Sequence, residues 1–122
     1  MEAITALRTR RSIRRYKNRA VSREMLETLV DCGRQAATGR GEQPWEFVVI
    51  TDSSTRNKLA EICEFGRFLA KAPAAIVVLC NNSKYYLEDG CNATQNILVA
   101  ANALGLGSCW VAGDKKPYAE QV

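Results

Sequence analysis

The sequence contains no histidine, and no two of its five cysteines form a C-x-x-C pair. Without histidine, the chain lacks the Ser-His-Asp and Cys-His machinery of nucleophilic catalysis, and a zinc site is disfavoured. Each cysteine lies in an apolar stretch, where free cysteine usually behaves as a small hydrophobic residue; a reactive thiol is the alternative. An enzyme built from these residues would therefore need a cofactor for its chemistry.

A long apolar run is also absent. The longest one, from Ala72 to Cys80, is far shorter than the roughly 18–20 residues that span a bilayer. The N-terminus alternates charged and apolar residues and lacks the apolar centre of a signal peptide. We therefore expect a cytoplasmic protein with no membrane partner.

The composition is that of a folded domain. Of the 122 residues, 47% are hydrophobic and 25% are charged, which is ordinary for a globular protein. A chain of this length can bury a core without disulfides or metals, and no repeat or low-complexity segment divides it. We expect residues 1–122 to form a single domain.

Hydrophobic periodicity and capping residues predict an α+β fold. Helices are expected at Glu2–Thr9, after Ser22, after Asp52-Ser53-Ser54 and at Glu88–Leu104, and strands at Trp45–Thr51, Ala74–Cys80 and Ser108–Ala112. The longest of these helices is apolar on more than one face, which is typical of a helix that another subunit partly buries.

The chain stops early for such a fold. Pro117 suits the first turn of a further helix, but only five residues follow it. Three strands are about half of a typical sheet, and they would leave an edge exposed. We therefore expect that a C-terminal part of the fold is missing and that apolar surface near Val122 lies open.

Basic charge is concentrated near the N-terminus. Residues 1–19 hold seven of the 17 Lys and Arg residues and one of the 13 acidic residues, although the net charge is only +4. Alternating residues of an extended segment point to the same side, so Arg10, Ser12 and Arg14 could converge on one phosphate. A solvated basic face and a nucleic-acid contact are the alternatives, but only Tyr16 offers an aromatic ring for base stacking.

Two glycine-containing segments are further candidates for ligand contacts. Thr38 to Pro44 is a polar loop before the strand at Trp45, and its glycines would let the backbone approach a planar ligand closely. Gly105-Leu106-Gly107 ends a helix and opens a strand. A dinucleotide-binding G-x-G must follow a strand and open a helix, so that interpretation is rejected.

Taken in order, these segments resemble the nitroreductase family of flavoproteins over essentially the whole chain. Arg10 to Arg14 is similar to the family's R-R-S-x-R, and Ala37 to Val49 to its P-S-x-x-N-x-Q-P-W-x-F-V-V. Asp89 to Trp110 resembles the family's D-x-x-x-A-x-Q-N-x-L-x-A-A-x-x-L-G-L-G-S-x-W. The resemblance covers the N-terminal two-thirds of the family and implies a three-layer sandwich, with a central, mostly antiparallel sheet flanked by helices.

The resemblance also implies a homodimer with FMN bound non-covalently at its interface. The implied flavin contacts are Arg10, Arg11, Ser12, Arg14, Thr38, Gly39, Gly41, Gln43, Val111, Ala112 and Gly113. The first four would hold the phosphate and the ribityl chain. Gly41 and Gln43 would lie near the isoalloxazine, and Thr38 and Gly39 would contact the flavin bound mainly by the other subunit. The last three would place their backbone over the reactive ring nitrogen, where an N–H group can tune hydride transfer.

Three positions depart from the family pattern. Ala37-Thr38 stands where the family often has Pro-Ser, and the hydroxyl is kept. Gly41 replaces the usual Asn, which removes one side-chain hydrogen bond to the flavin. Ala112 replaces a Glu of better-known bacterial members, which changes the expected nicotinamide contacts.

The implied activity is that of an NAD(P)H-dependent oxidoreductase. Hydride would pass to FMN and then, in a ping-pong cycle, to a small acceptor such as a nitroaromatic or a quinone, with no catalytic side chain. A dehalogenating or flavin-destroying member is one alternative, although only Asn81–Leu87 link the second strand to the long helix and leave little material for a lid. A flavin-binding sensor or a basic nucleic-acid module, without turnover, is the other.

Overall fold

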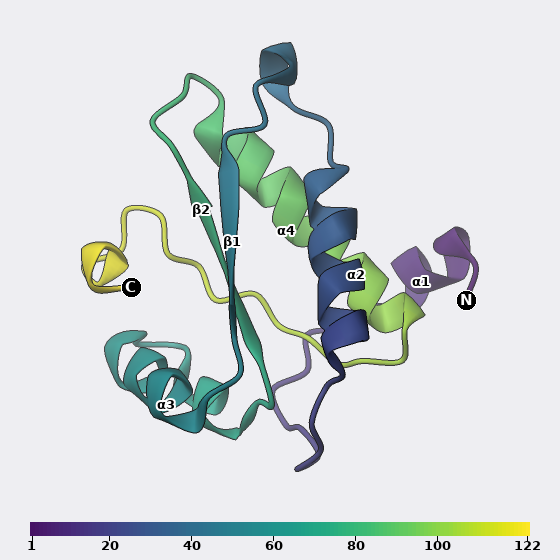
Figure 1. Cartoon of the computed structure of the whole chain (residues 1–122), viewed down its shortest axis with the longest axis vertical. Helices are drawn as coiled ribbons and strands as arrows, with labels where there is room; N and C mark the ends of the chain where they lie inside the picture. The colour runs from purple at the N-terminus through teal and green to yellow at the C-terminus, as the bar shows by residue number, and fades with distance from the viewer.

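The computed structural model describes every residue from Met1 to Val122 and arranges the chain in three layers (Figure 1). The middle layer is a sheet of two strands, β1 (Trp45–Ile50) and β2 (Ala75–Cys80). Helices α2 (Arg23–Arg34) and α4 (Tyr86–Ala103) cover one face of it, and α1 (Ala3–Thr9) packs against α4. Helix α3 (Ser53–Ile62), with the 3₁₀ turn η2 (Arg67–Lys71) beside it, lies over the other face.

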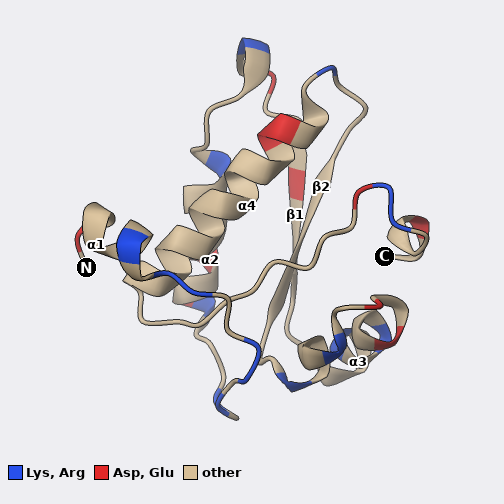
Figure 2. Cartoon of the chain, turned by 180° about the vertical axis from the view of Figure 1, so that it is seen from behind, with Lys and Arg blue, Asp and Glu red and all other residues tan.

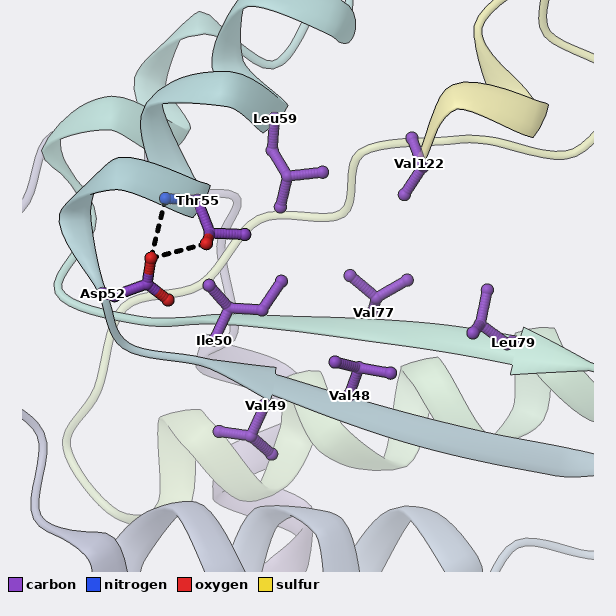
Figure 3. Close-up of a pocket in the computed structure, with 9 residues that line it drawn as sticks. All are labelled: Val48, Val49, Ile50, Asp52, Thr55, Leu59, Val77, Leu79 and Val122. Atoms are coloured by element: carbon purple, nitrogen blue, oxygen red, sulfur yellow. Dashed lines mark hydrogen bonds between the residues drawn. The ribbon is translucent and has the colours of Figure 1, made fainter.

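The two strands are antiparallel, and their register divides the sheet into two faces. Phe47 pairs with Val78 and Val48 with Val77, and directly opposed side chains point to the same side. Phe47 and Val78 pack against the core under α2 and α4. Val48 and Val77 point instead toward α3 (Figure 3).

The core lies between α2, α4 and the sheet. Leu26, Leu29, Ile97 and Ala101 are each at most 7% exposed there. Gly33 of α2 permits the close approach, because a Cβ at that position would lie 3.0 Å from the Ile97 side chain and 3.2 Å from Phe47. The packing of α2 on α4 therefore depends on the absence of a side chain at this position.

Side-chain caps begin two of the helices. The Ser22 hydroxyl accepts a hydrogen bond from the Met25 N–H at 3.2 Å, and the Asp52 carboxylate accepts one from the Thr55 N–H at 2.8 Å. The sequence predicts both caps, and they are confirmed. The two strands also lie within one residue of their predicted bounds.

The predicted strand at Ser108–Ala112 is wrong. Only Ser108 pairs with another segment, in a single parallel bridge to Ser12, where the Ile13 N–H donates to the Ser108 carbonyl at 2.9 Å. β-branched and aromatic residues such as Val111 and Trp110 favour a strand, but a ladder also needs an extended partner along its length. The segment has such a partner at one residue only.

The prediction of a helix from Pro117 is also wrong. The chain forms a 3₁₀ turn, η3 (Ala119–Gln121), in its place. Tyr118 is buried just before that turn, and its hydroxyl donates to the Ala112 carbonyl at 2.6 Å. This bond folds the last residues back onto the segment that follows α4.

Helix α4 is largely covered by its own chain. Ala93, Leu98 and Ala101 are at most 7% exposed beneath the neighbouring elements, and α1 lies across the C-terminal half of the helix. Its apolar residues therefore do not by themselves require a second subunit. Neither α4 nor any other helix combines the length and the hydropathy that a membrane crossing needs.

The outer face of the sheet is apolar and partly open (Figure 3). Val48 and Leu79 are 45% and 44% exposed, and they line a cavity of about 400 Å³ together with Leu59 of α3 and Val122. Val49 points away from this cavity, toward the helices on the other face. Each strand is paired along one edge only.

Candidate functional site

The basic segment leaves the C-terminal end of α1 as extended chain. Figure 2 shows its Arg and Lys residues as blue stretches of ribbon between α1 and α2. Asn102 of α4 holds its start, since the side-chain amide donates to the Ala6 carbonyl at 2.9 Å and to the Thr9 hydroxyl at 2.8 Å. The bridge between Ser12 and Ser108 then fixes the segment beside the chain that follows α4.

The positive charges of this segment have no acidic partner. The two ion pairs of the chain are both in α2, Arg23–Glu27 at 2.9 Å and Arg34–Asp31 at 2.7 Å. Arg11 and Arg14 are exposed, and so is Ser12 between them. Uncompensated guanidinium groups beside a hydroxyl are the donors that suit a phosphate, so the residues present fit the phosphate of FMN.

Arg14 also meets the segment that follows α4. It borders a groove of about 420 Å³ that is further lined by Phe65, Phe68, Trp110, Val111, Ala112, Lys116 and Tyr118. Two of the three residues predicted to lie over the flavin ring, Val111 and Ala112, are therefore next to a residue predicted to hold its phosphate. The fold brings them together although they lie at opposite ends of the sequence.

The backbone at the groove has unused donors. The N–H groups of Val111, Ala112 and Gly113 donate no hydrogen bond within the chain. Nearby bonds use other groups, since the Gly113 carbonyl accepts from the Lys116 N–H at 3.1 Å. Free N–H groups next to a guanidinium form a site for an anionic or strongly accepting ligand.

Tyr16 lies two residues after Arg14, and two contacts fix its position. Its hydroxyl donates to the Ile13 carbonyl at 2.5 Å, and its ring centroid lies 6.3 Å from that of Phe68. Burial raises the pKa of Tyr16 to about 12; Cys109 adds to the rise and Arg14 opposes it. The hydroxyl is thus a neutral donor over the whole physiological range.

The loop of residues 38–43 lies at the other end of the molecule (Figure 1), around the 3₁₀ turn η1 (Gly39–Gly41). Arg40, Gly41 and Gln43 have φ angles of 62°, 66° and 51°, a left-handed region that is strained for Arg and Gln. Gly and Asn adopt this region most readily. Gly41 therefore keeps the backbone shape that the family's Asn would allow, although it lacks the side chain.

The structure keeps this loop apart from the basic segment. Gly39 is bonded to Asp89 in the first turn of α4, whereas Thr9 is bonded to Asn102 in its last turn. At 1.5 Å per residue, these two points on the helix are about 20 Å apart. In one chain, Thr38, Gly39, Gly41 and Gln43 thus lie away from the start of the basic segment at Thr9. The segment of residues 111–113 runs on to Asp114, which accepts a hydrogen bond from the Tyr86 hydroxyl at 3.2 Å in the first turn of α4, so it is not kept apart from that end of the helix.

Two further residues contact these regions, and the sequence analysis assigned a role to neither of them. Lys116 borders the groove beside Arg14. Asp89 is buried and binds the loop at Gly39. The family motif that begins at Asp89 was the available signal for that residue. Nothing in the sequence placed Lys116 near Arg14.

Three layers of α+β structure, with free guanidinium and N–H donors facing one groove, define a candidate binding protein for a phosphate-bearing ligand. The model of the nitroreductase family matches residues 7–81, more than half of the chain. The chain belongs to the nitroreductase family.

Two curated relatives carry the provisional name NADH dehydrogenase/NAD(P)H nitroreductase. The protein from Methanothermobacter thermautotrophicus is 36% identical over 115 residues, covering 90% of this chain and 60% of the relative. The protein from Archaeoglobus fulgidus is 40% identical over 116 residues, covering 90% of this chain and 67% of the relative. The chain thus spans about three-fifths to two-thirds of their length.

Solved structures show the same fold. A provisional NADH dehydrogenase/NAD(P)H nitroreductase from Bacteroides thetaiotaomicron superposes with a TM-score of 0.94 at 32% identity, over 98% of this chain and 72% of that one. An FMN-dependent nitroreductase from Clostridium difficile gives a TM-score of 0.90 at 33% identity, over 98% and 71%. A shorter match, 36% identical over 59 residues and 48% of this chain, is an iodotyrosine deiodinase from Haliscomenobacter hydrossis.

Proposed function

We propose that the chain is the FMN-binding part of an NAD(P)H-dependent oxidoreductase that works as a homodimer. The observation that carries the proposal is the groove where Arg14, without an acidic partner, meets the free N–H groups of Val111 and Ala112. Membership of the nitroreductase family and the similarity to an FMN-dependent nitroreductase support it. Five unpaired cysteines suit the reducing cytoplasm.

Each part of the site has a distinct task in this proposal. Arg10, Arg11, Ser12 and Arg14 bind the phosphate and the ribityl chain through charge-assisted hydrogen bonds. The N–H groups of residues 111–113 donate to the flavin ring. FMN, when bound, supplies the redox chemistry, taking hydride from NAD(P)H and passing electrons to a small acceptor such as a nitroaromatic or a quinone. The protein orients both substrates, and no side chain acts as an acid or a base.

The separation of the two groups of predicted contacts supports a homodimer. The loop at Gly39 and the basic segment attach to α4 about 20 Å apart. We propose that a flavin held by the basic segment takes the loop from a second chain. Thr38 and Gly39 were expected to serve the partner's flavin, and Gly41 and Gln43 belong to the same loop, so we extend that role to them.

An absorbance spectrum of the purified protein tests the proposal. We expect a flavin spectrum, with bands that bleach on addition of NADH or NADPH and recover with a quinone. A nucleic-acid module would purify without the chromophore, and a flavin sensor would keep its bands in the presence of NAD(P)H. Either result would replace the oxidoreductase by the corresponding alternative.

The match to an iodotyrosine deiodinase makes dehalogenation a second candidate. It covers only about half of the chain, and only five residues, 81–85, separate β2 from α4. So short a link leaves no room there for a lid over a halogenated ring. Release of iodide from an iodinated phenol by the reduced protein, at a rate above that of quinone reduction, would favour this candidate.

A further inference from the structure

Asp89 is the one charged residue that the chain buries completely. It lies in the first turn of α4, and only 1% of its surface is exposed. One carboxylate oxygen, Oδ1, accepts a hydrogen bond from the Gly39 N–H at 3.0 Å. The other, Oδ2, is buried and has no partner.

Such a carboxylate destabilises the fold. A buried charge costs stability unless an opposite charge and hydrogen bonds compensate it. No Lys or Arg pairs with Asp89, and one of its two oxygens is unsatisfied. An apolar side chain of similar size would suit this position better, so its retention calls for a reason other than stability.

Two residues, Asp89 and Tyr85, contact the loop at Gly39. The Gly39 N–H is bonded to Asp89, and the Gly39 backbone lies directly against the ring of Tyr85. A Cβ at position 39 would lie 2.4 Å from the Tyr85 ring. Arg40, whose backbone is strained, follows at once, and Gln43 is the second strained residue of the loop.

Asp89 is also the most N-terminal of three polar side chains on one face of α4. The Asn92 amide donates to the Ala37 carbonyl at 3.3 Å, and the Asn96 amide donates to the Cys32 carbonyl at 3.0 Å. Spacings of three and four residues place these three side chains on one face of the helix. Their hydrogen bonds attach α4 to the end of α2, to Ala37 and to Gly39 in turn. Of the three side chains, only that of Asp89 is acidic and fully buried.

We infer that Asp89 is a positioning residue that holds the loop of residues 38–43 in the strained shape that contacts a ligand. A strained backbone persists only where the surrounding structure restrains it. The hydrogen bond from the Gly39 N–H to Asp89 is the side-chain contact next to the strained residue Arg40. The inference rests on the proposed function, because it takes the ligand of the loop to be the flavin of a second subunit.

Two substitutions of Asp89 test the inference. Asp89→Leu removes the acceptor and the charge, whereas Asp89→Asn keeps an acceptor for the Gly39 N–H. In the Leu variant we expect an unchanged or higher melting temperature, amide exchange at Gly39 at least about tenfold faster, and FMN affinity about tenfold weaker. The Asn variant should restore slow exchange and most of the affinity. Asn96→Ala is the matched control on the same face, because its side chain bonds the Cys32 carbonyl in α2 rather than the loop, and it should change neither quantity by more than about twofold.

Melting and amide exchange are measured without FMN, so they test the anchor independently of the proposed function. A lower melting temperature with unchanged exchange at Gly39 would make Asp89 a purely structural residue and overturn the inference. Faster exchange with unchanged FMN affinity would also overturn it, provided that Arg14→Ala weakens FMN binding. Absence of FMN binding in the unmodified protein would instead contradict the proposed function, while exchange at Gly39 would still decide whether Asp89 holds the loop.

Discussion

Arg14 is the residue where the basic segment meets the groove. It is exposed, pairs with no carboxylate, and borders Val111 and Ala112. Arg14→Ala is expected to weaken FMN binding by about 1.5–3 kcal/mol, the range for hydrogen bonds to charged groups. Titration followed by flavin fluorescence measures the change. Arg19→Ala removes an exposed charge outside the groove and should change the affinity little; equal losses in both variants would make the effect one of general charge.

Tyr16 makes the protein sensitive to alkali. Its pKa is raised from 10.0 to about 12, chiefly by burial, so the folded state holds the phenolic proton more tightly than the unfolded state does. This contribution to stability is complete below pH 10 and is lost as the pH rises toward 12. Tyr16→Phe should therefore lose less stability over this interval. Melting temperatures from pH 9 upward measure the difference, and parallel curves for both proteins would contradict it.

At the scale of elements, local signals were sufficient for most of the secondary structure. Ser22 and Asp52 begin helices because each satisfies an N–H group within three residues. The segment after α4 was predicted wrongly because a strand needs a partner, and the partner at Ser12 is nearly a hundred positions away in the sequence. Long-range pairing of this kind is not visible in local composition.

The same limit applied to the candidate site. Arg10–Arg14 was identifiable from its charge and spacing. The family resemblance implied only that Arg14 and Val111 contact the same flavin, and the groove that both residues border was found in the structure. The role of Asp89 needed coordinates, because a hydrogen bond across fifty residues leaves no periodic pattern. The packing of α1 on α4 was not predicted either. The spacing of Ile4 and Leu7, the large apolar residues of α1, did not indicate this contact, because both remain more than half exposed.

The contact between α2 and α4 depends on Gly33. Gly33→Ala should gain up to about 1 kcal/mol in helix propensity, but overpacking a filled core costs about 1–3 kcal/mol. Ile97 is itself enclosed and only 7% exposed, so it cannot move aside, and the packing term should win. We expect a net loss of about 1 kcal/mol in urea unfolding. Ile97→Val in the Gly33→Ala background should recover part of this loss, and a Gly33→Ala variant as stable as the parent would show that the contact has room.

At the scale of the whole molecule, the proposed flavin site draws on a loop and a basic segment that are attached to opposite ends of α4. The basic segment starts at the last turn of α4, and the Gly39 loop lies at its first turn (Figure 1). The segment after α4 runs from its bridge with Ser12 to Asp114, which is bonded to Tyr86 in the first turn. In the proposed homodimer, a two-fold axis would join the loop of one chain to the basic segment of the other. Bound flavin would then stabilise the dimer by mass action, since it contacts both chains.

Mixing two variants that each bind FMN weakly tests this arrangement directly. Arg14→Ala damages the groove, and Gly39→Ala damages the loop by driving a Cβ into Tyr85. Alone, each variant carries two damaged sites per dimer and should bind FMN weakly.

If every site takes its groove from one chain and its loop from the other, a mixed dimer has one intact site and one doubly damaged site. An equal mixture, exchanged to equilibrium, should therefore regain tight binding at about a quarter of all sites. FMN titration counts these sites, and sedimentation shows that the mixture is dimeric. If groove and loop served the same flavin within one chain, mixing would restore none, and the homodimeric site would have to be abandoned.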